Sequence, residues 1–335
     1  MRPALISTQN MPYRVALYNW LVARGVRVIL ISDGAFCDGL DAMVELVPAI
    51  RMCGLLWPKH HLNTDTAAPS VVFFDLRLLP WVLLRKSLKR TAFWGIGAGR
   101  RKIFNVLRKA VLRRSYGFLS YMPRGQSIVP HDRARNSIAV INSVFIGPVE
   151  NGWAESNRLV FLGTLDGRKR LDVLIKALRI LRDQGQHWEL AIAGDGPERE
   201  PLERQIASLG LQASVRFAGA LNTDQEKSEL FTGAFLTILP GQAGLSVLES
   251  CAYGVPVLTY EQAITGGERD VIIDGKTGFF YAKQTPDCLA GKIKVLSENP
   301  QRVRDISQRA HTYFHTKASG EHMAQRMLRY LRAMP

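Results

Sequence analysis

A single carboxylate lies near the start of an otherwise apolar helical run in residues 239–260, LPGQAGLSVLESCAYGVPVLTY. This stretch predicts the end of a strand, a loop with Gly241 and Gly244, a helix that holds Glu249, and a second strand. Glycines let backbone N–H groups approach a ligand closely, and a helix N-terminus favours negative charge. The pattern therefore indicates an anion site with a carboxylate one helical run behind it.

Three more loops stand in the same place relative to a strand. GTLDGRKR follows the run RLVFL, GDGPERE follows LAIA, and GALNTDQ follows VRFA. In an open parallel sheet such loops meet at the carboxyl ends of the strands, where ligands bind. Because each loop opens toward a helix, backbone N–H groups and positive helix ends converge there. We expect a nucleotide with phosphates in this crevice.

Short, solidly apolar runs alternate with helical patterns along the chain. We expect strands at 3–8, 27–32, 71–75, 91–95, 117–122 and 138–142, and again at 158–163, 188–194, 214–219, 235–240, 256–260 and 278–281. Helical spacing of apolar residues is clear at 13–25 and 171–185. This alternation predicts α/β domains with parallel sheets covered by helices on both faces.

One irregular segment, residues 145–157, is rich in glycine, proline and polar residues and divides the chain. A length of 335 residues suits two domains of ordinary size. We therefore predict two doubly wound, Rossmann-like domains facing a central cleft, at residues 1–147 and 148–335. The last helical pattern, 320–334, packs either on the second domain or back on the first.

The positive charge is concentrated in the first half of the chain. Residues 1–150 contain 21 Lys and Arg against 8 Asp and Glu, whereas residues 151–335 contain 23 against 21. No acidic residue occurs between Asp75 and Asp132, a stretch that holds 13 bases: Arg77, Arg85, Lys86, Lys89, Arg90, Arg100, Arg101, Lys102, Arg108, Lys109, Arg113, Arg114 and Arg124. Most charge runs are solvated faces, but one this one-sided favours an anionic partner. Because Trp81, Phe93, Trp94 and Phe104 are interleaved with the bases, we expect an anionic membrane surface and no nucleic acid.

Metal and cofactor motifs are missing from the sequence. The four cysteines are scattered, His60-His61 is the only histidine pair, and no Asp-x-Asp occurs. The run DGKTG has Asp270 where a P-loop needs glycine, and WGIGAG lacks the acidic partner of a dinucleotide fingerprint. We expect no metal and no cofactor. Without a signal peptide or a long apolar run, the expected location is cytoplasmic, peripheral at the inner face of the cell membrane.

Several segments, taken in order, resemble the family-4 retaining glycosyltransferases of the GT-B architecture. They are FLGTLDGRKRLDVLIKAL, LAIAGDGPERE, VRFAGAL, PGQAGLSVLESCAYGVPVLTYE and GGERDVIIDGKTGFFY. The segments NMPYRVALYNWL and AFWGIG are similar to the acceptor domains of bacterial members that build cell-surface polysaccharides such as lipopolysaccharide. The resemblance covers nearly the whole chain and is strongest from residue 159 to 281.

The resemblance implies a nucleotide-diphosphate sugar as co-substrate and a glycan acceptor, either lipid-linked or an oligosaccharide. Lys169 would be the catalytic charge on the leaving diphosphate, and Glu249 would bind the ribose hydroxyls. The other implied donor contacts are Thr164, Arg168, Gly194, Leu221, Gly241, Gly244, Leu245 and Ser246, and the implied acceptor contacts are Tyr13, Arg14, Trp94 and Ile96. The structural alternatives are a solvated loop lysine and a carboxylate favoured by the helix dipole.

Three positions depart from the family pattern. Gly241 stands where the first of two glutamates is usual, Thr164 where a phosphate-binding arginine is usual, and Ile96 where many relatives have histidine. Phosphate binding would then depend on Lys169, backbone amides, and Arg168 or Arg170. Two other functions stay open: a nucleotide-sugar-binding assembly subunit without catalysis, and a sugar-nucleotide epimerase of the same fold, which would need carboxylates and histidines in the crevice.

Overall fold

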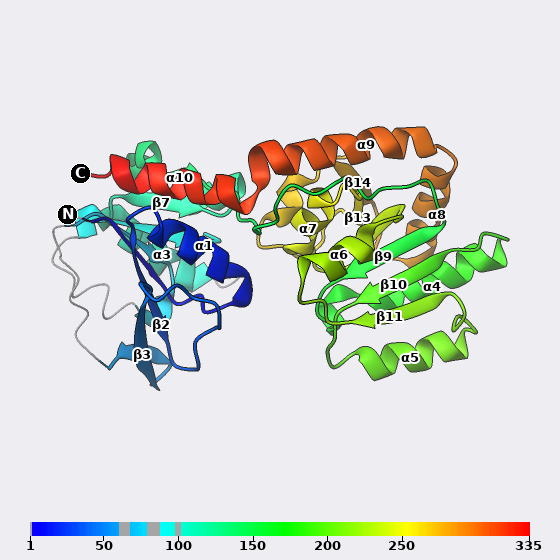
Figure 1. The fold of residues 1–335 in the computed structure, drawn as a ribbon, viewed down its shortest axis with the longest axis horizontal. Helices are drawn as coiled ribbons and strands as arrows, with labels where there is room; N and C mark the ends of the chain where they lie inside the picture. Colours follow the sequence, from blue (N-terminus) through cyan, green and yellow to red (C-terminus); the bar gives the residue numbers. More distant parts are fainter. Residues whose placement is uncertain (1, 60–67, 79–87, 98–101) are drawn as a thin grey trace. The chain divides into compact units, whose positions relative to one another are not determined.

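The structure, a computed structural model, describes residues 2–59, 68–78, 88–97 and 102–335. The chain forms two compact units (Figure 1), Met1–Phe145 with Gly320–Pro335, and Ile146–Ser319. The final helix, α10 (Gly320–Ala333), therefore belongs to the first unit. Of the two placements left open by the sequence, the helix takes the return to the first unit, and the second unit ends at Ser319.

The first unit is built on an eight-stranded sheet in the order β4-β3-β2-β1-β5-β6-β7-β8. Its strands are β1 (Ala4–Ser7), β2 (Arg27–Ser32), β3 (Glu45–Met52), β4 (Leu55–Pro58), β5 (Ser70–Phe73), β6 (Thr91–Gly95), β7 (Gly117–Ser120) and β8 (Ile138–Ala139). Neighbouring strands are parallel except β3 and β4. Without β4 this is the order of a doubly wound fold, whose switch point lies between β1 and β5.

The hairpin of β3 and β4 is absent from the sequence prediction. β3 pairs with β2 over residues 45–48 and then with β4 over residues 49–52. The turn residues Cys53 and Gly54 have φ values of 50° and 75°, as a two-residue type I′ turn requires. Exposed apolar residues such as Ile50 and Met52 hide the usual alternation of a hairpin, and Cys-Gly is not among its common turn sequences.

Helices cover both faces of this sheet. On one face, α1 (Pro12–Val22) and α10 share a core with Leu5 and its neighbours, and they lie side by side in Figure 1 as the blue and red helices. On the other face, α3 (Lys102–Arg114) contributes Val111 and Leu112 to a core with Ile6. Consecutive strand residues thus serve opposite cores, which explains why the strands are continuously apolar.

The second unit contains a parallel six-stranded sheet in the order β11-β10-β9-β12-β13-β14, again that of a doubly wound fold. Its strands are β9 (Arg158–Leu162), β10 (Glu189–Ala193), β11 (Val215–Gly219), β12 (Leu236–Leu239), β13 (Val257–Tyr260) and β14 (Gly278–Tyr281). Its helices are α4 (Leu171–Asp183), α5 (Arg199–Ser208), α6 (Asp224–Phe231), α7 (Ser246–Ala252), α8 (Pro286–Ser297) and α9 (Pro300–Tyr313). The predicted fold class, two doubly wound α/β domains, is confirmed.

Some residues singled out by the sequence lie outside the described residues: His60, His61, Trp81, Arg85, Lys86, Gly99, Arg100 and Arg101. Within the described ranges, no helix combines the length and apolar character needed to cross a bilayer. Over the same ranges, no three His, Cys, Asp or Glu side chains gather as metal ligands would.

Candidate functional site

The loops after β9 and β12 meet at the switch point of the second sheet. The two strands are neighbours in the sheet. The backbone N–H of Gln242 donates to the Arg168 carbonyl at 2.8 Å, and the Lys169 ammonium donates to the Gln242 carbonyl at 3.4 Å. The structure thus brings the lysine loop and the glycine loop together where doubly wound sheets bind their ligands.

Lys169 is a buried cation in this site, with a relative exposure of 9%. Burial lowers its pKa, and the positive charge of Arg168 acts in the same direction, whereas Asp166 and Glu268 oppose the shift. Within the described residues, no ion pair engages its ammonium group, and the Gln242 carbonyl at 3.4 Å is a weak acceptor. A desolvated ammonium with spare donor capacity suits a phosphate.

Gly241 is held where no side chain fits. A Cβ atom built there would overlap the Arg168 carbonyl oxygen and would lie 2.7 Å from the Lys169 carbonyl carbon, closer than real Cβ atoms approach. The contact between the two loops therefore requires glycine in this conformation. A glutamate, the residue that the resemblance would place at this position, would force the two loops apart.

Glu249 makes an ion pair that the sequence did not predict. Its carboxylate accepts from the ammonium of Lys227, on α6, at 2.7 Å, and the two side chains are 14% and 21% exposed. Tyr253, which follows Glu249 by one helical turn, donates its hydroxyl to the Asp224 carbonyl at the start of α6. One carboxylate oxygen of Glu249 is thus fixed by Lys227, and within the described residues no hydrogen bond engages the other.

Arg168 and Arg170, the alternative phosphate ligands, are each engaged with a carboxylate. Arg168 donates to Asp166 at 2.7 Å, and Arg170 donates to Asp172 at 3.0 Å and to Gln284 at 3.2 Å. Their positive charges are already balanced by these neighbours. Lys169 is therefore the better phosphate ligand of the three.

Backbone groups complete the site. Within the described residues, the N–H groups of Gly244 and Leu245 donate no hydrogen bond, so both are available to a ligand ahead of α7. Gly194 packs so closely on the loop after β9 that a Cβ atom there would overlap the Gly163 carbonyl. Its contribution is to loop packing. Thr164 is exposed and Leu221 is half-buried in their loops.

Two charged residues of the loop after β13 were missed as site residues. Glu268 is buried, accepts from the Gly266 N–H at 3.0 Å, and acts electrostatically on Lys169. The Nε of the adjacent Arg269 is buried and has no hydrogen-bond acceptor among the described residues. The Ala243 N–H donates to the Ile264 carbonyl at 2.8 Å, so this loop adjoins the glycine loop. The available signal was an acidic and a basic residue directly after Gly266-Gly267.

Arg14, predicted to contact an acceptor, is fully buried in the first unit. Its guanidinium donates to Gln9 at 2.9 Å, to the Tyr121 hydroxyl at 3.2 Å and to Asn142. Within the described residues these partners are neutral, and the rings of Tyr13, Trp94 and Tyr121 surround the charge at 4.8 to 5.4 Å. In this conformation Arg14 organises the loop after β1 and has no surface for an acceptor.

The other three predicted acceptor residues differ in exposure. Trp94 is fully buried, and its indole N–H has no acceptor within the described residues. Tyr13 and Ile96 are exposed, at 37% and 52%. Only the two exposed residues can contact an acceptor directly in this conformation.

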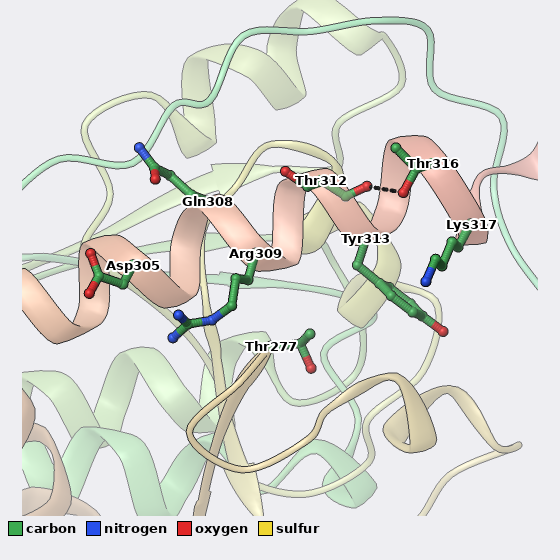
Figure 2. Close-up of a pocket in the computed structure, with 8 residues that line it drawn as sticks. All are labelled: Thr277, Asp305, Gln308, Arg309, Thr312, Tyr313, Thr316 and Lys317. Carbon is green, nitrogen blue, oxygen red and sulfur yellow. Dashed lines mark hydrogen bonds between the residues drawn. The ribbon is translucent and has the colours of Figure 1, made fainter.

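A cavity of about 500 Å³ in the second unit lies away from these loops. It is formed by α9, the π turn Phe314–Ala318 and Thr277, the residue before β14. Figure 2 shows Arg309 extending toward the Thr277 loop, where it donates to the Lys276 carbonyl at 3.1 Å. Because Thr277 precedes β14, this cavity is at the amino end of that strand, opposite the candidate site.

Comparison with known families finds a match that covers most of the second unit. Residues 148–313 match the family model of Glycosyl transferases group 1. The chain is 30% identical over 156 residues to the D-rhamnosyltransferase WbpZ of Pseudomonas aeruginosa, which covers 45% of this chain and 39% of that protein. It is also 32% identical over 162 residues to a GDP-mannose-dependent phosphatidylinositol dimannoside mannosyltransferase of Mycobacterium tuberculosis. That match covers 47% of this chain and 40% of the relative. The chain thus spans less than half the length of these relatives.

Solved structures extend the likeness to both units. HepE of Anabaena, crystallised with UDP, has a TM-score of 0.74 at 15% identity and covers 99% of this chain and 100% of its own. Sucrose-phosphate synthase of Thermosynechococcus elongatus has a TM-score of 0.73 at 16% identity and covers 99% of this chain and 98% of its own. At this identity the likeness is one of fold, the two-domain GT-B architecture.

Proposed function

The second unit belongs to the family Glycosyl transferases group 1, and from this premise we propose that the chain is a glycosyltransferase that moves a sugar from a nucleotide-diphosphate donor to a glycan acceptor. One observation carries the proposal. The buried ammonium of Lys169 reaches the Gln242 carbonyl at 3.4 Å, in the loop whose Gly244 and Leu245 N–H groups donate no hydrogen bond within the described residues. Cations and N–H donors aimed at one place stabilise a diphosphate.

The reaction we propose retains the configuration of the sugar. The acceptor hydroxyl attacks the anomeric carbon from the face of the leaving group, the bond to the β-phosphate oxygen breaks, and that oxygen takes the proton of the hydroxyl. The protein then needs no nucleophile of its own. Its task is to hold Lys169 and the loop amides where negative charge grows on the leaving diphosphate.

The ribose of the donor would bind at Glu249. A carboxylate accepts hydrogen bonds from two adjacent hydroxyls, and Lys227 fixes the carboxylate by its 2.7 Å contact. The pair therefore selects a ribonucleotide and sets its orientation, while Lys169 acts on the phosphates. Glu249 would thus serve binding of the donor, and Lys169 would serve the chemical step.

A lipid-linked acceptor at the inner membrane surface accounts for the first unit. Its helix α3 exposes Val106, Leu107 and Lys109 on one stretch, and Arg113 and Arg114 end the helix. Exposed apolar side chains among cations are typical of helices that lie on anionic lipid. We propose a cytoplasmic, peripheral protein that acts in cell-surface polysaccharide synthesis.

A thermal-shift panel of UDP, GDP, ADP, dTDP and CMP sugars tests the donor site. A nucleotide at 100 times its dissociation constant should stabilise the protein by about 2.7 kcal/mol, and Lys169→Ala should remove most of that gain. No stabilisation by any nucleotide would refute the proposal. Binding without sugar transfer to any acceptor would instead favour an assembly subunit, for which the closed loops at Gly241 are the motivating observation.

We also propose that no metal takes part, because Lys169 and the loop amides already supply positive charge to the diphosphate. Turnover should then persist in excess EDTA. A loss on chelation that Mg²⁺ or Mn²⁺ restores would overturn this part of the proposal.

A further inference from the structure

The switch point of the first unit opens into a cavity of about 750 Å³. β1 and β5 are neighbours there, and the Thr8 hydroxyl donates across the gap to Asp75 at 2.8 Å. Residues that follow β5 and β6, the β3–β4 turn and the first turns of α3 line the cavity. It occupies the position at which a doubly wound domain binds its ligand.

The walls of this cavity are largely apolar. They include Leu55, Phe73, Phe74, Leu76 and Phe104. Phe104 is 41% exposed, and Ile96 at the mouth is also exposed. Phe73 is half-buried and Phe74 is buried, so Phe104 is the aromatic side chain that would gain most free energy when an apolar ligand covers it.

Two guanidinium groups share the cavity with a single carboxylate. Asp75 accepts from Arg77 through Nη2 at 2.7 Å and Nε at 3.0 Å, and this contact raises the pKa of Arg77 and fixes its side chain. Arg108 donates to Asn105 at 3.2 Å, and the structure shows no ion pair for it within the described residues. Burial lowers the pKa of Arg108, and the charge of Asp75 opposes this shift. The cavity therefore has an excess positive charge beside its apolar wall.

We propose that this cavity binds a lipid phosphate, with the phosphate on Arg108, Arg77 remaining paired with Asp75, and the first carbons of the chain against Phe73, Phe74 and Phe104. Inorganic phosphate would leave the aromatic wall uncovered, and a neutral lipid would leave Arg108 without an anion. The inference rests on the proposed function, in which the first unit holds the acceptor. It identifies that acceptor as an amphiphile recognised through both its phosphate and its chain.

Calorimetry on the full chain with geranyl phosphate, a short soluble probe, tests this site. Geraniol and inorganic phosphate serve as half-probes, and each should bind at least ~10-fold more weakly, because each forfeits either the charged hydrogen bonds or the apolar contact. Arg108→Met and Phe104→Ser should each lower the affinity for geranyl phosphate by ~10-fold or more. Equal affinity for all three probes would overturn the proposal.

Matched controls come from the same unit but from outside α3. Arg24→Met and Leu46→Ser change exposed positions that do not line the cavity, and both should leave the affinity unchanged. If Arg24→Met weakens binding as much as Arg108→Met, general attraction to the basic unit explains the result and the cavity is not the site. Thermal melting of each variant separates lost binding from lost folding.

The unmodified chain offers a second measurement. Cys53 is exposed and lines the cavity, whereas Cys288 is in the other unit. Geranyl phosphate should slow alkylation of Cys53 by a maleimide and leave that of Cys288 unchanged, as read by mass spectrometry. Unchanged alkylation of Cys53 contradicts the site. If nucleotides bind while geranyl phosphate does not, this inference fails and the proposed donor site stands.

Discussion

In the second unit the switch point is closed around one buried ammonium group, whereas in the first unit it opens into a cavity with two guanidinium groups and aromatic walls. The strand orders are the same apart from β4 and β8, the two edge strands of the first sheet. Around Lys169 the neighbours are glycines, carbonyls and free amides. Around Arg108 they are phenylalanines. The strand order determines where a ligand binds, and the side chains of the loops determine its chemistry.

The largest effect should come from Lys169→Ala. The ammonium faces charge that grows as the bond to the phosphate breaks, so kcat should fall by about 10²–10³-fold, as when one electrostatic donor is lost. Steady-state kinetics check this, with Lys176→Ala on the exposed face of α4 as a control. A rise in KM with unchanged kcat would assign the lysine to ground-state binding.

The same ammonium predicts a pH dependence. Because burial lowers the pKa of Lys169 from the ordinary 10.5, its charge is lost as the pH rises. Nucleotide affinity should therefore weaken at a lower pH than it would with an ordinary lysine.

Glu249→Ala should act mainly on donor binding. The hydrogen bonds that we propose from Glu249 to the ribose would be the same in ground state and transition state, so KM should rise about 10–100-fold with a smaller change in kcat. Glu249→Gln keeps the shape of the side chain without its charge, so its KM should lie between those of the wild type and Glu249→Ala. Kinetics of the two variants decide. If both variants match the wild type and remain folded, the ribose does not bind at this carboxylate.

Gly241→Ala tests how tightly the second switch point is closed. The added methyl group would overlap the Arg168 carbonyl, and such overpacking should destabilise the protein by about 1–3 kcal/mol. Urea unfolding measures the change. Gly244→Ala in the same loop is the matched control, because a Cβ atom there meets nothing within 4 Å. Equal stability of the two variants would show that the loops do not close as described.

Lys227→Met tests the ion pair on Glu249. Without Lys227 the carboxylate keeps its place less well, so selection of a ribonucleotide over its 2′-deoxy form should weaken by about 1 kcal/mol, the net contribution of a typical hydrogen bond. Calorimetry measures this selection as the ratio of the affinities for GDP and dGDP, or for the corresponding pair of nucleotides if the protein binds another base. Lys227→Arg should restore it in part. A variant that still selects as the wild type does would make the pair dispensable for recognition.

The smallest effect per residue should come from the surface of the first unit. Lys109→Gln and Arg113→Gln on α3 should each weaken binding to anionic vesicles by about 1 kcal/mol at low salt, and less at physiological salt, where the screening length is ~8 Å. Co-sedimentation at low and high salt tests this, with Lys176→Gln in the second unit as a control. Equal binding of the wild-type protein to neutral and anionic vesicles would exclude an electrostatic membrane surface.

Local patterns in the sequence were sufficient to predict most of the fold. The apolar runs at 158–163 and 235–240 became β9 and β12, because a strand buried on both faces must be continuously apolar. The order of strands and helices then placed Lys169 and Glu249 in loops and helix starts after those strands. The β3–β4 hairpin escaped prediction because its exposed Ile50 and Met52 break the usual alternation.

The sequence by itself thus determined the two α/β domains and the edge of the sheet at which a ligand binds, since both follow from the spacing of apolar residues along the chain. Only the tertiary structure showed that Lys227 meets Glu249, 22 positions away, that Gly241 excludes any side chain, and that Arg14 is enclosed by neutral groups. Ion pairs, steric exclusion and burial depend on distances between residues remote in the chain. In the sequence, a lysine in DQEKSELF is indistinguishable from a solvated surface charge.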